Sequence, residues 1–150
     1  MLIAVNGGGW LGTNEDDLNV FGGAKALTDL GFAVVSVRYT VAAGYNADGT
    51  FNTSWHPRTL PQDVDKAIRW VRAYAGTLGV DPNRVIVAGH SAGAHLVALV
   101  TAGNFAAPNL PAALQAVSSK PNGVIPAPGV VPRPALRRPT PGSRSQVQHA

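Results

Sequence analysis

The sequence contains no cysteine, which excludes disulfide bonds and thiolate ligands for a metal. It also has no apolar run near the roughly 20 residues with which a helix crosses a bilayer. The N-terminal residues are apolar, but they lack the basic start and the length of a secretory signal. These absences predict a cytoplasmic protein with no metal and no membrane partner. A length of 150 residues suits one domain of ordinary size.

Acidic residues are absent from residues 120–150, which hold five of the Lys and Arg residues. Residues 1–119 hold the other seven and all eight Asp and Glu, so their net charge is −1 against +5 for the C-terminal stretch. The basic charge is confined to that stretch and does not predict a nucleic-acid partner. Seven of the twelve prolines also fall there, without helix or strand periodicity. We predict a domain over residues 1–119 and a disordered, basic, Pro/Arg-rich tail over residues 120–150.

Apolar runs alternate with helical patterns along the predicted domain. The pattern predicts strands over 2–5, 32–39 and 85–88, and helices over 18–30, over 60–74 and from 92 onward. Asp16 and Asp17 are candidate N-caps of the first helix, Gly31 is its C′ residue, and Asp63 is expected to favour the dipole of the second. Residues 41–59 suggest a turn within a small hairpin. The order predicts an α/β fold: a short, mostly parallel sheet flanked by helices and joined by right-handed crossovers.

The third predicted strand leads directly into Gly89-His90-Ser91-Ala92-Gly93, and a helical pattern follows at once. Strand, sharp turn and helix form the context of a G-x-S-x-G nucleophile elbow. Residues 89 and 93 are expected to be glycine because strand and helix pack closely there. Ser91 is therefore a candidate nucleophile, and the Ala92 amide at the helix start is a candidate donor to an oxyanion.

A second glycine-rich run, Asn6-Gly7-Gly8-Gly9-Trp10, follows the first predicted strand. No Lys follows these glycines, so a phosphate-binding loop is not indicated, and we expect no cofactor. Uncovered backbone amides make the run a candidate oxyanion loop, and a flexible loop is the alternative. Both glycine-rich runs follow strands, and sites in parallel sheets lie outside the carboxyl ends of the strands.

Five segments, in this order, resemble the α/β-hydrolase esterases: Asn6–Trp10, Val35–Tyr39, Asp63–Val71, Asp81–Val85 and Gly89–Gly93. The likeness spans residues 1–105 and is nearest to hormone-sensitive-lipase-like, feruloyl-esterase-like and kynurenine-formamidase-like enzymes. It implies a partial α/β-hydrolase fold. It also implies a serine carboxylic-ester hydrolase that acts on a small ester through an acyl-enzyme.

The resemblance carries over residue by residue at the two glycine-rich runs. It implies Ser91 as the nucleophile and an oxyanion hole built from the amides of Gly8, Gly9 and Ala92. Gly7 would shape the loop, while Gly89 and Gly93 would support the elbow. The family usually begins its glycine run with His where this chain has Asn6, whose side chain is expected to hold the loop by a hydrogen bond.

No Asp or Glu follows Ser91, whereas the triad of this family runs Ser, then Asp or Glu, then His. The later histidines are His95, expected to pack or hydrogen-bond locally, and His149 in the predicted tail. The leading strands of the family fold, and those that carry the acid and base, are not matched either. We therefore expect an incomplete hydrolase of impaired activity: a fragment, a misannotated reading frame or a decayed gene product.

Two alternatives stay open at this point. The chain could be a non-catalytic binding or assembly module that self-associates through open sheet edges. It could also be a full enzyme whose missing strands come from another chain. Ester, amide and formamide bonds all suit the same nucleophile geometry, so the sequence does not separate them.

Overall fold

A parallel sheet forms the centre of the molecule in the computed structural model, which describes residues 1–12, 18–41, 59–103 and 105–127. Within those residues the sheet has four strands in the order β2-β1-β3-β4. They are β1 (Leu2–Val5), β2 (Val34–Val37), β3 (Ile86–Gly89) and β4 (Gly123–Pro126). All three neighbouring pairs are parallel. The predicted α/β class with a short parallel sheet is confirmed.

The two central strands account for the continuous apolar runs in the sequence. Every residue of β1 is buried, and β3 is buried at all positions but its first. Leu2 pairs with Val34 on one side and with Ile86 on the other. A strand covered on both faces and on both edges has no position that favours a polar side chain, which is why the alternating pattern is absent.

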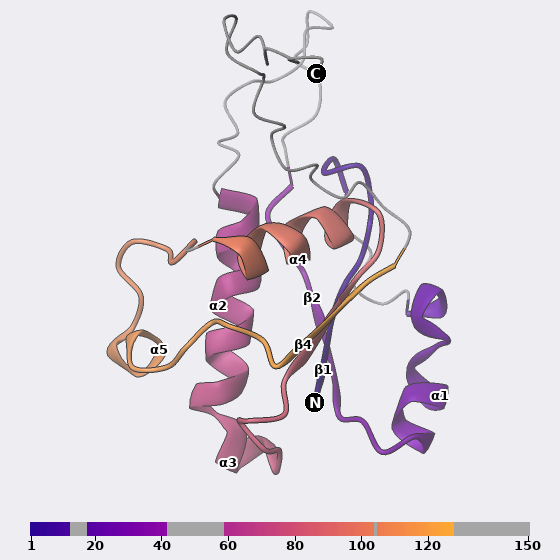
Figure 1. Ribbon diagram of the computed structural model, residues 1–150, viewed down its shortest axis with the longest axis horizontal. Helices are drawn as coiled ribbons and strands as arrows, with labels where there is room; N and C mark the ends of the chain where they lie inside the picture. Colours follow the sequence, from indigo (N-terminus) through magenta and orange to yellow (C-terminus); the bar gives the residue numbers. More distant parts are fainter. Residues whose placement is uncertain (13–17, 42–58, 104, 128–150) are drawn as a thin grey trace, which may run out of the picture.

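Helices cover the two faces of the sheet unequally (Figure 1). Helix α1 (Ala24–Asp29) lies on one face, and α2 (Thr59–Ala73) and α4 (Ala92–Ala102) lie on the other. The short helices η1 (Asn19–Phe21), α3 (Ala75–Leu78) and α5 (Ala112–Gln115) lie in the connections. The chain moves from β1 outward to β2 and then back past β1 to β3 and β4. Right-handed crossovers place the connections of the two directions on opposite faces, as observed.

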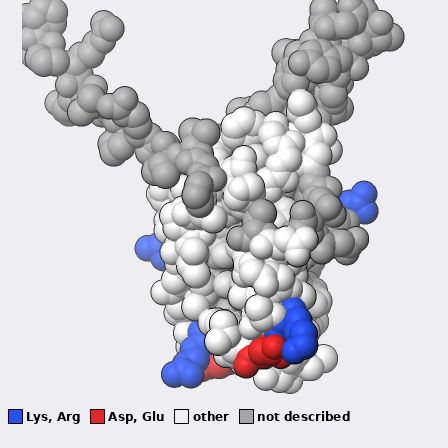
Figure 2. Space-filling view, turned by 90° about the vertical axis from the view of Figure 1, so that its right-hand side faces the viewer, with Lys and Arg blue, Asp and Glu red and all other residues white. Residues whose placement is uncertain are grey.

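The main core lies between the sheet and the layer of α2 and α4. Helix α2 buries a stripe of side chains spaced by three and four residues: Leu60, Pro61, Val64, Asp65, Ile68 and Val71. Helix α4 is apolar on most sides and packs against both α2 and the strands β3 and β4. On the α1 side, most of the visible charged side chains gather at the amino end of the strands, and the rest of the described surface is largely uncharged (Figure 2).

The helix predicted over residues 18–30 is divided in the structure. The 3₁₀ turn η1 ends at Phe21, and α1 begins only at Ala24. Gly22 and Gly23 between them have φ of +89° and +84°, a backbone conformation that a continuous right-handed helix excludes. Gly31, at φ +83°, follows the end of α1 as predicted. The candidate caps Asp16 and Asp17 lie outside the described residues, and so does most of the segment 41–59.

Asp63 does not lie in the first turn of its helix, because α2 already begins at Thr59. The expected role at the helix dipole is therefore wrong. The Asp63 carboxylate instead accepts the backbone amide of Thr40, at 2.8 Å, just beyond β2. A second oxygen contacts Lys66 at 3.5 Å. Asp63 thus ties α2 to the carboxyl end of β2.

Strand β4 falls inside the stretch 120–150, for which no strand was predicted, so that expectation is wrong for residues 123–126. The strand is held by backbone pairing with β3, which places no demand on side-chain alternation. It lies at the edge of the sheet, and its last two residues are exposed. Residues 128–150 of the predicted tail lie outside the described residues.

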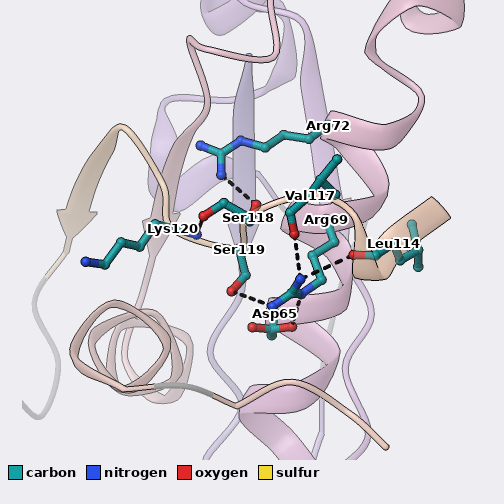
Figure 3. A network of polar contacts seen from close by, with 8 residues as sticks. All are labelled: Asp65, Arg69, Arg72, Leu114, Val117, Ser118, Ser119 and Lys120. Carbon is teal, nitrogen blue, oxygen red and sulfur yellow. Dashed lines mark hydrogen bonds and ion pairs between the residues drawn. The ribbon is translucent and has the colours of Figure 1, made fainter. Parts of the chain in front are cut away.

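Two arginines of α2 hold the connection that leads to β4 (Figure 3). Arg69 pairs with Asp65 at 2.7 Å and donates to the carbonyl oxygens of Leu114 and Val117. Arg72 donates to the Ser118 carbonyl at 2.6 Å and to Asn122 Oδ1 at 3.0 Å. The guanidinium groups supply donors to a segment with little regular structure. They fix the course of the chain into β4.

Candidate active site

Ser91 occupies the turn between β3 and α4 in a strained backbone conformation. Its φ of +50° and ψ of −118° lie in a region that residues with a Cβ rarely adopt. Such a conformation costs about 1–3 kcal/mol and persists only where neighbouring contacts impose it. The His90 amide donates to the Val5 carbonyl at 3.1 Å, and the Gly93 amide donates to the His90 carbonyl at 2.8 Å. These bonds hold the turn from both sides.

The glycines that flank Ser91 lie where strand and helix approach most closely. A Cβ at Gly89 would lie 2.5 Å from the Gly93 carbonyl oxygen. A Cβ at Gly93 would overlap the carbonyl oxygen of Val5 in β1. In both cases the added Cβ would clash with backbone atoms, which cannot relieve the clash by a change of rotamer. The start of α4 is thereby packed directly onto β1 and β3.

The loop after β1 lies against the same turn. A Cβ at Gly7 would lie 2.9 Å from Ser91 Cβ, so the glycine permits direct contact between loop and elbow. Gly8 and Gly9 follow with φ of +139° and +60°. The Gly8 carbonyl accepts the amides of Leu11 and Gly12, at 3.0 and 3.1 Å, which closes a tight turn. These hydrogen bonds give the loop a defined turn.

Three backbone amides near Ser91 have no partner within the described part of the chain. Those of Gly8 and Gly9 donate no hydrogen bond there. The Ala92 amide belongs to the first residue of α4, a position with no acceptor inside its own helix. Free amides and a helix N-terminus together favour an anionic oxygen.

The sheet topology explains why the two glycine-rich runs meet. β1 and β3 are neighbours, yet the chain leaves β1 toward β2 and leaves β3 toward β4. Connections that diverge in this way mark the topological switch point at which ligands bind in open parallel sheets. The loop Gly7–Gly9 follows β1 at this point, and Ser91 follows β3.

The two histidines near the elbow, His90 and His95, form no hydrogen bond with the Ser91 hydroxyl in the described part of the chain. Ser91 Oγ makes no hydrogen bond within the described residues. The His95 ring packs edge-on against Trp10, with 5.5 Å between centroids, and its buried Nδ1 has no hydrogen-bond partner in the ranges that the structure describes. His90 Nδ1 lies beside Gly7. Among the described residues, no three His, Asp or Glu side chains gather as a metal site requires.

Two aromatic residues at the site had no predicted role. The Tyr39 hydroxyl lies 3.4 Å from the carbonyl oxygens of Gly7 and Gly12, and burial raises the pKa of Tyr39 above its usual value of 10.0. Trp10, at φ +64°, rests on His95. Asn6 is buried at the end of β1, only 4% exposed. In the sequence, Tyr39 stood out only as the last residue of the segment Val35–Tyr39. That position did not predict which groups its hydroxyl contacts.

Comparison with known proteins gives concordant matches. The family model BD-FAE matches residues 1–122. Esterase LipQ of Mycobacterium tuberculosis (strain ATCC 25618 / H37Rv) is 32% identical over 99 residues, which are 66% of this chain and 21% of LipQ. Carboxylesterase NlhH of Mycobacterium tuberculosis (strain CDC 1551 / Oshkosh) is 32% identical over 105 residues, 67% of this chain and 28% of NlhH. The chain thus spans less than a third of the length of these curated relatives.

Solved structures agree with the sequence matches. Thermogutta terrifontis esterase 2 phosphoramylated by tabun has a TM-score of 0.62 and 25% identity, over 82% of this chain and 42% of that structure. The propionate-bound form of the same esterase has a TM-score of 0.62 and 26% identity, over 82% and 41%. The fold, the order of the motifs and the family match coincide. The chain belongs to the BD-FAE family and has the fold of the α/β-hydrolase esterases.

Proposed function

We propose that the chain is a carboxylic-ester hydrolase in which Ser91 is the nucleophile. The observation that carries the proposal is the strained conformation of Ser91, φ +50° and ψ −118°, between β3 and α4. Ser91 Oγ would bond to the ester carbonyl carbon and give its proton to a base. The tetrahedral intermediate would then release the alcohol, and water would hydrolyse the acyl-enzyme to the acid and free Ser91.

The oxyanion of that intermediate would lie against the amides of Gly8, Gly9 and Ala92. Their lack of other acceptors in the described residues supports this role, because donors already used elsewhere stabilise no new charge. The first turn of α4 adds its positive dipole end at Ala92. Asn6 and Gly7 would shape the loop, and Gly89 and Gly93 would hold the elbow against the sheet.

The proton acceptor limits the activity of these 150 residues. No Asp or Glu follows Ser91, and the Ser91 hydroxyl has no hydrogen-bonded base in the described part of the chain. Without an oriented base, a serine keeps the weak nucleophilicity of an alcohol. An oxyanion hole with substrate binding still leaves roughly 10³–10⁴-fold over water when triad members are removed. We therefore propose that these 150 residues, by themselves, carry out slow, Ser91-dependent chemistry with activated electrophiles.

A fluorophosphonate probe tests this proposal directly. It forms a bond from Ser91 Oγ to phosphorus with loss of fluoride, and the adduct is read by intact-mass and peptide mass spectrometry. The expected result is labelling that Ser91→Ala abolishes. Ser36→Ala is the matched control, because Ser36 Oγ on β2 also has no hydrogen-bond partner among the described residues but lies outside the site. Equal labelling of wild type and Ser91→Ala, or none of a demonstrably folded chain, would refute the proposal.

A second candidate function is assembly through the sheet edges. In the described residues β2 and β4 each pair with a single strand, and Ile125 on β4 is 51% exposed. Unpaired strand edges with apolar side chains favour association with another copy. Light scattering after size exclusion would detect a dimer, and Ile125→Lys would weaken it. A monomer at all concentrations would exclude this function.

A further inference from the structure

Tyr39 connects the carboxyl end of β2 to the glycine loop that follows β1. Its side chain is almost fully buried, with 2% of the residue exposed. Its hydroxyl lies 3.4 Å from the Gly7 carbonyl oxygen and 3.4 Å from the Gly12 carbonyl oxygen. These residues are 32 and 27 positions away in the sequence. The one hydroxyl proton is shared between the two carbonyl oxygens, so Tyr39 contacts both ends of the turn that contains Gly8 and Gly9.

The loop has few other means of fixing its orientation. Gly7, Gly8 and Gly9 carry no side chain with which to pack, and Gly8 and Gly9 have positive φ. Because glycine has no Cβ, it can adopt these positive φ angles, but its backbone is also free to adopt many others. A defined geometry of the loop therefore needs contacts from residues outside the glycine run. The Gly8 carbonyl closes the turn internally by accepting Leu11 and Gly12. Tyr39 attaches the turn to β2.

The contact between the Tyr39 hydroxyl and the Gly7 carbonyl also affects the direction of the Gly8 N–H, because both groups belong to the same peptide bond. The Gly7 carbonyl and the Gly8 amide belong to one planar trans peptide unit, in which C=O and N–H point in opposite directions. A hydroxyl that holds the Gly7 carbonyl on one side therefore fixes where the Gly8 N–H points on the other. Gly7 itself lies against Ser91, where a Cβ would be 2.9 Å from Ser91 Cβ. The fixed peptide is thus adjacent to the elbow.

We propose that Tyr39 is a positioning residue whose hydroxyl orients the Gly8 amide toward the oxygen that becomes charged during reaction at Ser91. This inference rests on the proposed function, since it assigns that amide to the oxyanion. It differs from simple packing in one respect. Loss of the hydroxyl alone should slow the chemical step while the ring, and the core around it, stay in place.

The test compares Tyr39→Phe with Tyr74→Phe in the full chain. Tyr74 also loses one hydroxyl, but it is exposed, and its ring packs at a tilt of 41° against Trp70 just after the end of α2. Fluorophosphonate labelling at Ser91 is measured against probe concentration to separate the maximal rate kinact from the binding constant KI. For Tyr39→Phe we expect kinact to fall roughly tenfold, the equivalent of one hydrogen bond, with KI unchanged. Tyr74→Phe should match the wild type.

Two controls make the outcome specific. Thermal unfolding of Tyr39→Phe should stay cooperative, with Tm lowered by no more than the loss of one hydrogen bond, and hydrogen exchange should rise only in the peptide that covers residues 6–12. If exchange rises throughout the domain and KI increases along with the fall in kinact, Tyr39 merely supports the fold and the inference is overturned. If Tyr39→Phe labels like the wild type, the inference also fails. A wild type that is not labelled at Ser91 overturns the proposed function instead, and the positioning role with it.

Discussion

The ion pair between Asp65 and Arg69 offers a direct test of how α2 holds the second half of the domain. Both residues lie on α2 four positions apart, and their atoms approach to 2.7 Å. The Asp65 side chain is only 1% exposed and that of Arg69 13%, so both charges are largely removed from water. Arg69→Met keeps an unbranched chain of similar course but leaves the Asp65 carboxylate buried without its counter-charge.

The expected loss is about 3–5 kcal/mol of unfolding free energy, because an uncompensated buried charge keeps the desolvation cost without the attraction that offset it. The carbonyl oxygens of Leu114 and Val117 also lose their donor, which adds to the loss. Small domains have a total unfolding free energy of about 5–15 kcal/mol, so the loss would be a large fraction of the stability of the chain. Urea unfolding followed by far-ultraviolet circular dichroism measures the change.

Lys25→Ala is the matched control. Lys25 and Asp29 form the same i,i+4 ion pair at 2.7 Å on α1, but their side chains are 87% and 61% exposed. An exposed pair of this spacing contributes only about 0.3–0.5 kcal/mol. The double variant Asp65→Leu/Arg69→Met removes both charges and should be more stable than Arg69→Met alone. Equal effects of Arg69→Met and Lys25→Ala would refute the argument from burial.

Three further predictions follow from particular contacts. Gly93→Ala should destabilise the fold by about 1–3 kcal/mol, because the new Cβ meets the Val5 carbonyl. Gly76→Ala is the control: its Cβ would have no atom within 4 Å, so the change should be neutral or stabilising. Urea titrations measure both. Asn122→Ala should cost about 1–3 kcal/mol, because the amide of Val85 and the guanidinium of Arg72 both donate to Asn122 Oδ1, and circular dichroism melts would measure it. Burial raises the pKa of Tyr39, so the unfolded chain releases this proton first. Its contribution to the unfolding free energy is therefore complete below about pH 10 and falls above it by up to about 1.4 kcal/mol per pH unit, a slope that Tyr39→Phe should remove from alkaline unfolding curves.

The sequence alone predicted most of the local features of this protein. The apolar runs predicted the three strands that begin near residues 2, 34 and 86, and the spacing of apolar residues predicted α2 and α4 within a residue or two at their starts. The glycines at 89 and 93 predicted a close approach between strand and helix. Each of these signals depends on neighbours within about one helical turn, where side-chain period and backbone sterics act directly.

The break in the helix predicted over residues 18–30 was not predicted, although its cause is local as well. The two adjacent glycines at 22 and 23 were outweighed by the apolar spacing around them, yet their positive φ ends one element and starts another. A single glycine lowers helix stability by about 1 kcal/mol, but two in succession at φ near +85° are incompatible with the helix itself.

The tertiary structure alone decided the long-range features. Strand β4 exists because its backbone finds β3, and its own residues carry no strand pattern. Arg69 and Arg72 are ordinary cations of a helix in the sequence, but the partners that they find in the segment before β4 lie 45–50 residues away, across α5 and its connections. Tyr39 meets the glycine loop only because β2 and β1 are paired in parallel, which brings their carboxyl ends together. Periodicity and turn chemistry specify elements, whereas the partner of a buried hydroxyl or guanidinium is fixed only when the sheet order and crossovers bring distant segments together.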